Sequence, residues 1–288
     1  MLSRRAFLAG VGAVAGLTAC GARAAALASA ASAQARRRLK RIGIQLWTVR
    51  DQMQRDIAGT FQRLAEIGYR EVEFAGYFGH SPAQLRADLD RAGLTAVSTH
   101  GELDLVRNHW SEALDTASEL GLRYITINWL PAESRRTLDD WRRIADDFNS
   151  AGERARARGL RLAYHNYDVT LQPVEGTVPL DLLLERVSPE NMDFQMDVYW
   201  LVVGGGDPLA WIRRHPTRFT MLHVKDSAGP PKHAQTDVGA GVIDFRSILA
   251  LDAAQRGAIQ HVFVEQDDPA DSLAFAKRGF DYLSRLEY

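Results

Sequence analysis

Eight short, mostly apolar segments, each ending in a polar side chain, constrain the fold of this chain more than any other feature. They span residues 42–47, 71–74, 95–100, 123–128, 162–165, 192–197, 219–223 and 261–265. Successive strand side chains point to opposite faces. Gln45 and Trp47 therefore share one face of the first segment, and Ile44 and Leu46 share the other. This pattern is typical of a closed barrel whose chemistry lies at the carboxyl ends of its strands.

The stretches between these segments have apolar residues at helical spacing. The predicted helices span residues 57–67, 82–92, 110–120, 138–158, 179–187, 208–215, 245–256 and 272–285. Gly68, Gly93, Gly121 and Gly159 each follow a helix and precede a strand, where left-handed caps are common. Strict alternation predicts a parallel sheet covered by helices, so we expect one α/β domain, a (β/α)8 TIM barrel, over residues 42–288. The alternative is an open doubly wound sheet, but no glycine-rich phosphate motif follows the first strand.

Residues 1–41 are predicted to be a targeting segment and an Ala-rich tether. Arg4 and Arg5 form a twin-arginine pair before an apolar stretch that is too short to span a membrane. Residues 17–20 resemble a lipobox ending in Cys20, the only cysteine of the chain, which excludes an internal disulfide. We expect twin-arginine export to the periplasm, with either a lipid anchor at Cys20 or cleavage later, within residues 28–35.

The charge of the predicted barrel argues against a nucleic-acid partner. Residues 1–41 hold eight Arg and Lys residues and no Asp or Glu, which leaves 27 basic and 36 acidic residues in the remainder, a net charge of −9. Nucleic-acid enzymes need a basic surface for the phosphate backbone.

Four strand-end residues form a candidate metal site: His165, Asp197, His223 and Glu265. They end the fifth to eighth segments, so their side chains should converge at one end of a barrel. Imidazole and carboxylate ligands together suit Mn²⁺, Zn²⁺, Co²⁺ or Mg²⁺. Each residue alone also has an ordinary explanation, as a solvated carboxylate or a histidine bonded to a loop carbonyl.

Other strand ends supply candidate catalytic residues. Glu265 and His100 are the candidate acid or base, because carboxylates and imidazoles are common proton-transfer groups. Lys225 lies two residues beyond His223 and is expected to hydrogen-bond a sugar oxygen; the alternative is a surface salt bridge.

Substrate-binding side chains are expected at or just beyond the ends of the first, second, fourth and sixth strands. Sugar C–H faces stack well on indole rings, so Trp47, Trp129 and Trp200 are candidate walls of a carbohydrate pocket. The alternative is that these indoles pack under loops. The complete predicted set of substrate-binding residues is Trp47, Glu73, Asn128 and Trp200.

Five segments carry a resemblance to a known family: Tyr164-His165-Asn166, Met196-Asp197-Val198-Tyr199-Trp200, His223-Val224-Lys225-Asp226, the stretch 238–245, and Val264-Glu265-Gln266-Asp267. They resemble the sugar phosphate isomerase/epimerase family, which has the xylose isomerase-like barrel, over about residues 42–287.

The resemblance implies a divalent metal at Asp197, His223 and Glu265, and a proton shift next to a sugar carbonyl. Two features of this chain depart from the family pattern. His165 stands where classical members have Glu. Tyr167 and Thr170 stand where one subgroup has a second His and a Glu, so a two-glutamate proton relay is not expected.

These observations together predict an exported, divalent-metal-dependent sugar isomerase or epimerase. Export and the net negative charge favour an unphosphorylated small carbohydrate as substrate. One alternative is a lyase or hydrolase of 3-keto-glycosides on the same site. Another is a non-catalytic sugar-binding lipoprotein, which the missing Glu at position 165 motivates.

Overall fold

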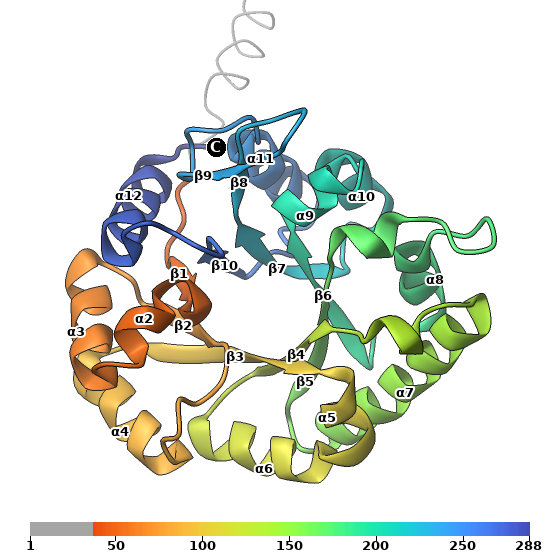
Figure 1. Cartoon of the computed structure of the whole chain (residues 1–288), viewed down its shortest axis with the longest axis horizontal. Coiled ribbons are helices and arrows are strands. Elements are labelled where there is room, and N and C mark those ends of the chain that lie inside the picture. The colour runs from red at the N-terminus through yellow and green to blue at the C-terminus, as the bar shows by residue number, and fades with distance from the viewer. Residues whose placement is uncertain (1–36) are drawn as a thin grey trace, which may run out of the picture. The chain divides into compact units, whose positions relative to one another are not determined.

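Eight parallel strands close into a barrel with the helices outside, as Figure 1 shows along the barrel axis. The computed structural model describes residues 37–288. The barrel strands are β1 (Gly43–Gln45), β2 (Glu71–Phe74), β3 (Thr95–Glu102), β4 (Tyr124–Trp129), β5 (Arg161–His165), β6 (Met192–Asp197), β7 (Phe219–Val224) and β10 (His261–Val264). Each pairs with its neighbours in this order, and β10 closes the ring on β1. The predicted TIM barrel is confirmed, and each strand begins within one residue of its predicted segment.

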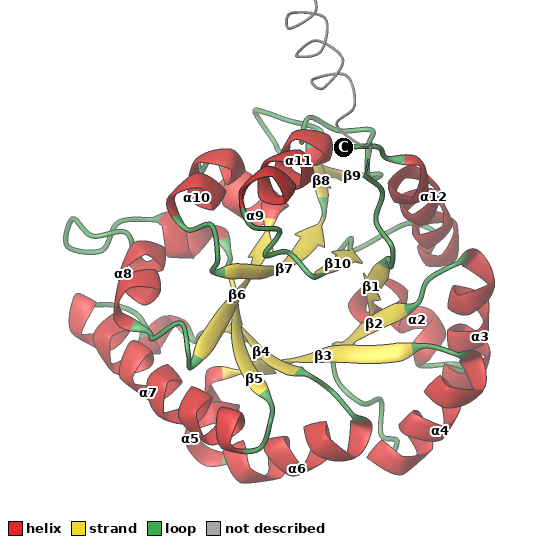
Figure 2. Ribbon diagram, turned by 180° about the vertical axis from the view of Figure 1, so that it is seen from behind, coloured by secondary structure: helices red, strands yellow, loops and turns green. Residues whose placement is uncertain are grey.

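Eight longer helices surround the barrel (Figure 2). They are α3 (Ile57–Ile67), α4 (Pro82–Ala92), α6 (Trp110–Leu120), α7 (Leu138–Ala157), α8 (Pro179–Arg186), α10 (Pro208–Arg214), α11 (Phe245–Gln255) and α12 (Ser272–Arg285). All begin at the predicted residue. Side chains such as Ser81, Thr137 and Asp271 accept backbone N–H groups of the first turn and fix these starts. Gly93 and Gly121 end their helices with φ of 70° and 72°, as predicted.

The sequence pattern did not predict the short elements in the loops that follow the strands. They are η1 (Leu46–Val49), α2 (Arg50–Met53), α5 (Leu103–Asn108), η2 (Ala132–Ser134), η3 (Asp168–Leu171), α9 (Val198–Val203), β8 (Asp226–Ser227) and β9 (Gln235–Thr236). One of them corrects the first strand, which was predicted to continue to Trp47. The Gln45 side chain accepts the Trp47 N–H at 3.1 Å and turns the chain into η1.

The barrel interior consists of an apolar layer with a polar layer above it. Val97, Tyr124, Ala163, Met221 and Phe263 form the apolar layer. Gly43 faces Phe263, and a Cβ on Gly43 would lie 2.5 Å from that ring, so β1 has room only for glycine there. The upper layer includes the fully buried polar residues Gln45, Glu73 and Gln195.

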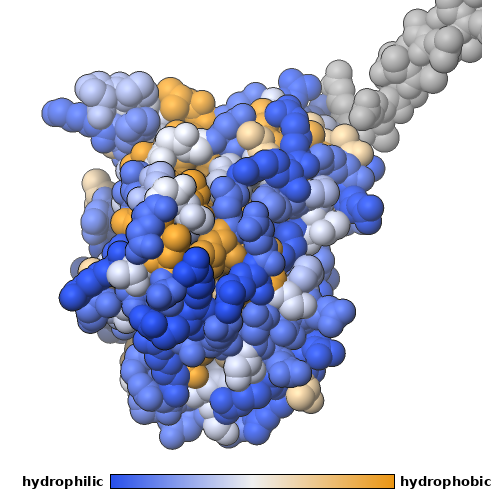
Figure 3. Space-filling model, turned by 90° about the vertical axis from the view of Figure 1, so that its right-hand side faces the viewer, coloured by the Kyte–Doolittle hydropathy of each residue, from blue (hydrophilic) through white to orange (hydrophobic). Residues whose placement is uncertain are grey.

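The outer face of the helices is polar. On the side shown in Figure 3, the surface is mostly hydrophilic and hydrophobic residues occupy limited areas. Within residues 37–288, no helix is both long and apolar enough to cross a membrane. Arg4, Arg5 and Cys20 lie outside the described residues, so export and lipidation stay predictions.

Candidate metal centre

The structure brings His165, Asp197, His223 and Glu265 together at the carboxyl ends of four adjacent strands. Each offers one ligand atom, these atoms all lie within 4.8 Å of one another, and all four residues are buried. The register pairs Asp197 with His223, and Glu265 follows directly after β10. These four residues are spread over a hundred positions of the sequence, and strand pairing brings them to the same depth in the barrel. The cluster could hold a metal ion.

Unpartnered polar atoms in this cluster fit a divalent cation. Asp197 Oδ1 accepts the Trp200 N–H at 2.9 Å, but the buried Oδ2 has no hydrogen-bond partner among the described residues. Both ring nitrogens of His165 are likewise buried without a hydrogen-bond partner, and Nε2 lies 3.3 Å from Asp197 Oδ2. Buried polar atoms are nearly always hydrogen-bonded. Buried ligand atoms without hydrogen bonds, on a set of His and carboxylate side chains, are expected at a site that binds a divalent metal.

His165 is prepared to act as a neutral ligand. Burial lowers the pKa of its imidazole to about 4, although the neighbouring Asp197 opposes this shift. Histidine binds metal only when deprotonated, so His165 needs no proton removal near neutral pH.

His223 is held between two carboxylates. Its Nδ1 lies 2.7 Å from Glu265 Oε2, and its Nε2 lies 2.6 Å from Glu73 Oε1. Burial would lower the pKa of His223, but Glu265 and Glu73 outweigh burial and raise it to about 10. A metal ion that binds at Nδ1 must therefore displace a proton from His223.

Lys225 supplies positive charge to the cluster. Its Nζ lies 3.4 Å from Asp197 Oδ2, 3.0 Å from Glu265 Oε2 and 2.8 Å from Asp267 Oδ1. Burial opposes the charged form, yet the carboxylates raise the pKa of Lys225 well above its usual value. The ammonium that was expected to face a sugar oxygen is thus engaged by three carboxylates and compensates their charge.

Glu73 lies beneath the cluster and connects its own strand, β2, to four other strands. Burial would raise its pKa, but His100 and His223 hold it well below its usual range. Gln45 Nε2 and Gln195 Nε2 donate to its oxygens at 2.8 and 2.7 Å. Glu73, predicted as a substrate contact, is fully buried and positions the two imidazoles from below.

His100 lies across the barrel from the predicted ligands and contacts them. Its Nε2 is 2.9 Å from Gln195 Oε1 and 3.0 Å from Glu73 Oε1. Its ring lies parallel to that of His223, with centroids 5.3 Å apart. His100 retains about 9% side-chain exposure, whereas His223 has none, so His100 is the imidazole better placed to meet a substrate.

Gln195 and Asn166 are supporting residues that the candidate set did not contain. Alternation along β6 already placed Gln195 on the inner face with Asp197, and this was the available signal. Asn166 accepts the Asp197 N–H at 3.0 Å and donates to the Asp197 carbonyl at 3.1 Å. This two-bond clip fixes the end of β6 to the end of β5.

The predicted substrate contacts other than Glu73 lie at the mouth of the barrel. The Trp47 side chain is 42% exposed, and the Arg50 guanidinium lies 4.4 Å above its ring. Asn128 and Trp200 are half-buried. These three residues follow or end strands β1, β4 and β6, so they surround the same opening.

The long loop after β7 is attached to the barrel. The buried Asp226 carboxylate accepts the N–H groups of Gly239 and Gly241 at 2.9 and 3.0 Å. A Cβ at Gly241 would lie 2.2 Å from Asp226 Oδ1, which explains the glycine in this motif. In the middle of the loop, Gln235 on β9 bonds to Asp267, the residue that also binds Lys225.

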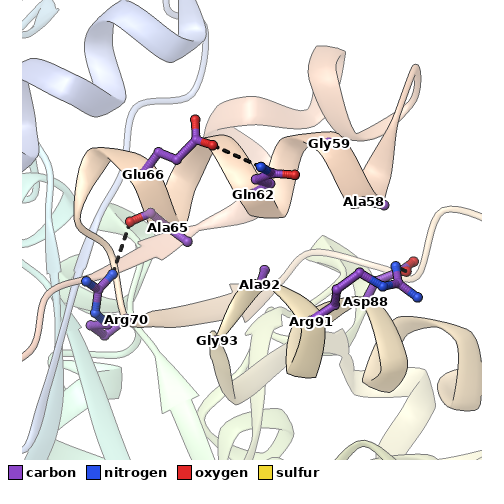
Figure 4. Close-up of a pocket in the computed structure, with 10 residues that line it drawn as sticks. All are labelled: Ala58, Gly59, Gln62, Ala65, Glu66, Arg70, Asp88, Arg91, Ala92 and Gly93. Carbon is purple, nitrogen blue, oxygen red and sulfur yellow. Dashed lines mark hydrogen bonds and ion pairs between the residues drawn. The ribbon is translucent and has the colours of Figure 1, made fainter.

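A hollow of about 740 Å³ lies on the outside of the barrel between α3 and α4 (Figure 4). Gln62 and Glu66 are hydrogen-bonded to each other along one wall, and Asp88 and Arg91 lie on the other. Its lining mixes charges of both signs and includes none of the predicted site residues. The cluster at the strand ends is therefore the better candidate for chemistry.

The fold and site define an α/β barrel with a buried His and carboxylate cluster. The chain belongs to the xylose isomerase-like TIM barrel family, whose sequence model matches residues 61–283. An inosose dehydratase of Lacticaseibacillus casei is 30% identical over 156 residues, 48% of this chain and 51% of that protein. The chain thus matches about half the length of that curated relative.

Two further similarities extend over more of the chain. An inosose dehydratase of Salmonella typhimurium is 26% identical over 261 residues, which cover 77% of this chain and 86% of that protein. The crystal structure of a sugar phosphate isomerase/epimerase from Parabacteroides distasonis has a TM-score of 0.76 and 25% sequence identity. It covers 85% of this chain and 93% of its own. The resemblance expected from the sequence motifs is confirmed.

Proposed function

We propose that this protein is a metal-dependent enzyme that removes a proton next to the carbonyl of a small polyhydroxy ketone and then eliminates water. The cluster of His165, Asp197, His223 and Glu265 carries the proposal, because unpartnered ligand atoms lie there beside groups that hold protons. The relatives named inosose dehydratases support elimination of water as the outcome.

The residues of the cluster suit two proton transfers. A divalent ion, when bound, polarises a carbonyl oxygen and acidifies the neighbouring C–H. Glu265 is the candidate base: burial would raise its pKa, but Lys225 and His223 hold it well below its usual range and keep it ionised. His100 is the candidate acid, because Gln195 and Glu73 hold Nε2 and leave Nδ1 to protonate the departing hydroxyl. The C–H proton thus passes to Glu265, the hydroxyl leaves as water, and a double bond conjugated to the carbonyl remains.

The charges around the cluster favour an unphosphorylated substrate. Lys225 is ion-paired with three carboxylates, and Arg50 at the mouth is paired with Asp268. A phosphate group would need cations that are not already paired. The net charge of −9 over residues 42–288 opposes an anionic substrate as well.

Isomerisation or epimerisation is the second candidate. The similarity to the Parabacteroides distasonis sugar phosphate isomerase/epimerase extends over nearly all the described residues and favours it. Both reactions begin with the same proton removal, but in isomerisation the proton returns to carbon and no water leaves.

Metal analysis and deuterium exchange test the proposal. The purified protein, loaded with Mn²⁺, Co²⁺, Zn²⁺ or Mg²⁺, is incubated with inosose and with keto-sugars in D₂O and followed by NMR and mass spectrometry. We expect stoichiometric metal and a product lighter by one water; a deuterated product of unchanged composition would indicate an isomerase. If the metal-loaded protein exchanges no substrate proton, both reactions are contradicted, and the remaining hypothesis is a non-catalytic sugar-binding lipoprotein.

Glu265→Gln should abolish exchange because it removes the candidate base. Glu71→Gln is the matched control. Glu71 is also buried, but it is the first residue of β2 and therefore lies at the other end of the barrel, where it is hydrogen-bonded to His261. Loss of activity in both variants would show that the loss is structural.

The cellular location belongs to the same proposal. We expect export because Arg4 and Arg5 form a twin-arginine pair, and a lipid anchor because Cys20 ends a lipobox-like segment. Changing Arg4 and Arg5 to Lys should retain the protein in the cytoplasm, and Cys20→Ala should release it from membranes. Membrane association that survives Cys20→Ala would contradict the anchor.

A further inference from the structure

Three aromatic rings form a row that leads from the candidate metal ligands to the surface. Trp200 lies three residues after Asp197, Tyr167 lies two residues after His165, and Trp129 ends β4. The Tyr167 ring centroid is 5.0 Å from that of His165, 5.3 Å from that of Trp200 and 6.0 Å from that of Trp129. Strands β4, β5 and β6 are neighbours in the barrel (Figures 1 and 2), so the row follows one side of its mouth.

The outer ring of this row is not explained by packing. Trp129 is 45% exposed, one of few large hydrophobic side chains so exposed within residues 37–288, whereas Tyr167 and Trp200 are half-buried. Tyr167 meets Trp129 with the ring planes at 89°, an edge-to-face contact that supports the indole from one side. An exposed indole held in place beside a site is a surface on which a ring can stack.

The inner part of the row has a polar group suited to a ligand. Trp200 Nε1 is a buried donor with no hydrogen-bond partner among the described residues. The Lys225 ammonium lies 5.7 Å from the centroid of the same indole. Buried donors generally have a hydrogen-bond acceptor. A hydroxyl of a molecule bound between Trp200 and the cluster could accept the hydrogen bond from Nε1.

A single six-membered ring at the cluster does not need the outer ring of the row. The ring of Tyr167 separates His165 from Trp129, with centroid distances of 5.0 and 6.0 Å on its two sides. A ring whose carbonyl lay at the metal ligands would be beside Tyr167 and Trp200, one ring contact short of Trp129. A second ring joined to the first would reach the exposed indole.

We propose that the row is a second-ring subsite and that the substrate is a glycoside, with a keto-sugar ring at the cluster and a sugar or aromatic aglycone stacked on Trp129. This inference rests on the proposed function for the orientation of the keto ring. It narrows the substrate class from polyhydroxy ketones in general to two-ring molecules.

Binding of unreactive probes tests the subsite separately from turnover. Methyl β-glucoside, cellobiose and p-nitrophenyl β-glucoside are titrated into the metal-loaded protein by calorimetry. We expect the two-ring probes to bind at least 5-fold more tightly than the methyl glycoside. Trp129→Ala should remove most of this advantage and leave the methyl glycoside unchanged, whereas Trp129→Phe should keep it, because stacking needs only an aromatic face. Trp129 is exposed, so its truncation should not unfold the barrel, and a melting curve checks this.

Equal binding of one-ring and two-ring probes, or equal weakening of both by Trp129→Ala, would overturn the subsite. If two-ring probes are preferred but deuterium exchange is absent, the proposed chemistry fails and the subsite stands. If a one-ring ketone turns over and two-ring probes show no preference, the chemistry stands and the subsite fails.

Discussion

At the scale of single residues, the two oxygens of Asp197 have different tasks. Oδ1 accepts the Trp200 N–H and begins α9, and Oδ2 faces His165, His223 and Lys225 without a hydrogen bond. The carboxylate is held ionised: burial would raise its pKa, but Lys225 and His165 lower it. The local backbone therefore fixes the direction in which the charged oxygen points.

Asp197→Asn should weaken Mn²⁺ or Co²⁺ binding by about 100-fold or more. Mutation of a residue that only hydrogen-bonds to a metal ligand typically lowers metal affinity by about 10–100-fold, and the loss of a charged ligand should lower it further. Asn can still accept the Trp200 N–H, so the fold should persist. Asp193→Asn is the matched control on the same strand, because Asp193 pairs with Arg161 at 2.7 Å, away from the cluster. Calorimetric titration compares them; equal affinity in wild type and Asp197→Asn would contradict Asp197 as a ligand.

His100→Asn should leave metal content unchanged and slow proton exchange by roughly 10²–10⁴-fold, the range expected for a lost general acid or base. The exchange rate of a keto substrate in D₂O, measured at saturating metal, reports this step. His109→Asn, at an exposed position on the outer surface, should change neither quantity. A His100→Asn protein that loses its metal would instead place His100 among the supporting residues of the metal site.

At the scale of elements, the ends of neighbouring strands are tied together in pairs. The Asn166 clip joins the segments after β5 and β6, and the register of β6 with β7 then fixes Asp197 against His223. The Asp267 carboxylate joins the segment after β10 to Lys225 and to Gln235 on β9. The cluster is thus a property of strand ends held in register.

Asn166→Ala should lower the free energy of unfolding by about 1–3 kcal/mol, because it leaves the buried N–H and carbonyl of Asp197 without partners. It should also weaken metal binding, since the end of β6 is released. Asn149→Ala removes comparable side-chain bonds, to Arg186 O and Ser188 N on the outer surface, and should leave metal affinity unchanged. Urea unfolding and metal titration of both variants separate the effects; unchanged metal affinity in Asn166→Ala would show that the clip only stabilises the fold.

The barrel strands, the longer helices and the convergence of the four candidate ligands could be predicted from the sequence because they depend on periodicity. Alternation along a strand fixes which side chains face inward, and helix caps fix where strands resume. The placement of Glu73 could not be read, because it depends on pairing between strands, including a register shift between Val72 and Glu73 against β3. The ion pairs of Lys225 could not be predicted for the same reason, because Asp197, Glu265 and Asp267 come together only when the barrel closes.

At the scale of the whole molecule, barrel closure buries a set of charges that responds to pH. The pKa values of Glu73 and Glu265 are held well below their usual value, so their stabilising effect is present above about pH 4.5 and is lost as pH falls. The pKa of His223 is raised from 6.5 to about 10, so its effect is complete below pH 6.5 and is lost as pH rises through 10. Protein prepared without metal should therefore be most stable between these limits.

Metal binding should change this pH dependence at its alkaline limit. A metal ion held by His223 Nδ1 would displace the proton that this nitrogen shares with Glu265, while Nε2 faces Glu73, so metal affinity should rise with pH, by up to about tenfold per pH unit between pH 6 and 9. Since the bound form has already lost this proton, the difference in melting temperature between metal-loaded and metal-depleted protein should widen over the same range. Calorimetric titration with Mn²⁺ in two buffers of different ionisation enthalpy measures the protons released, and we expect about one per metal. Metal binding that releases no proton and has the same affinity at pH 6 and 9 would mean that His223 keeps both carboxylate bonds and that the metal is held by other residues.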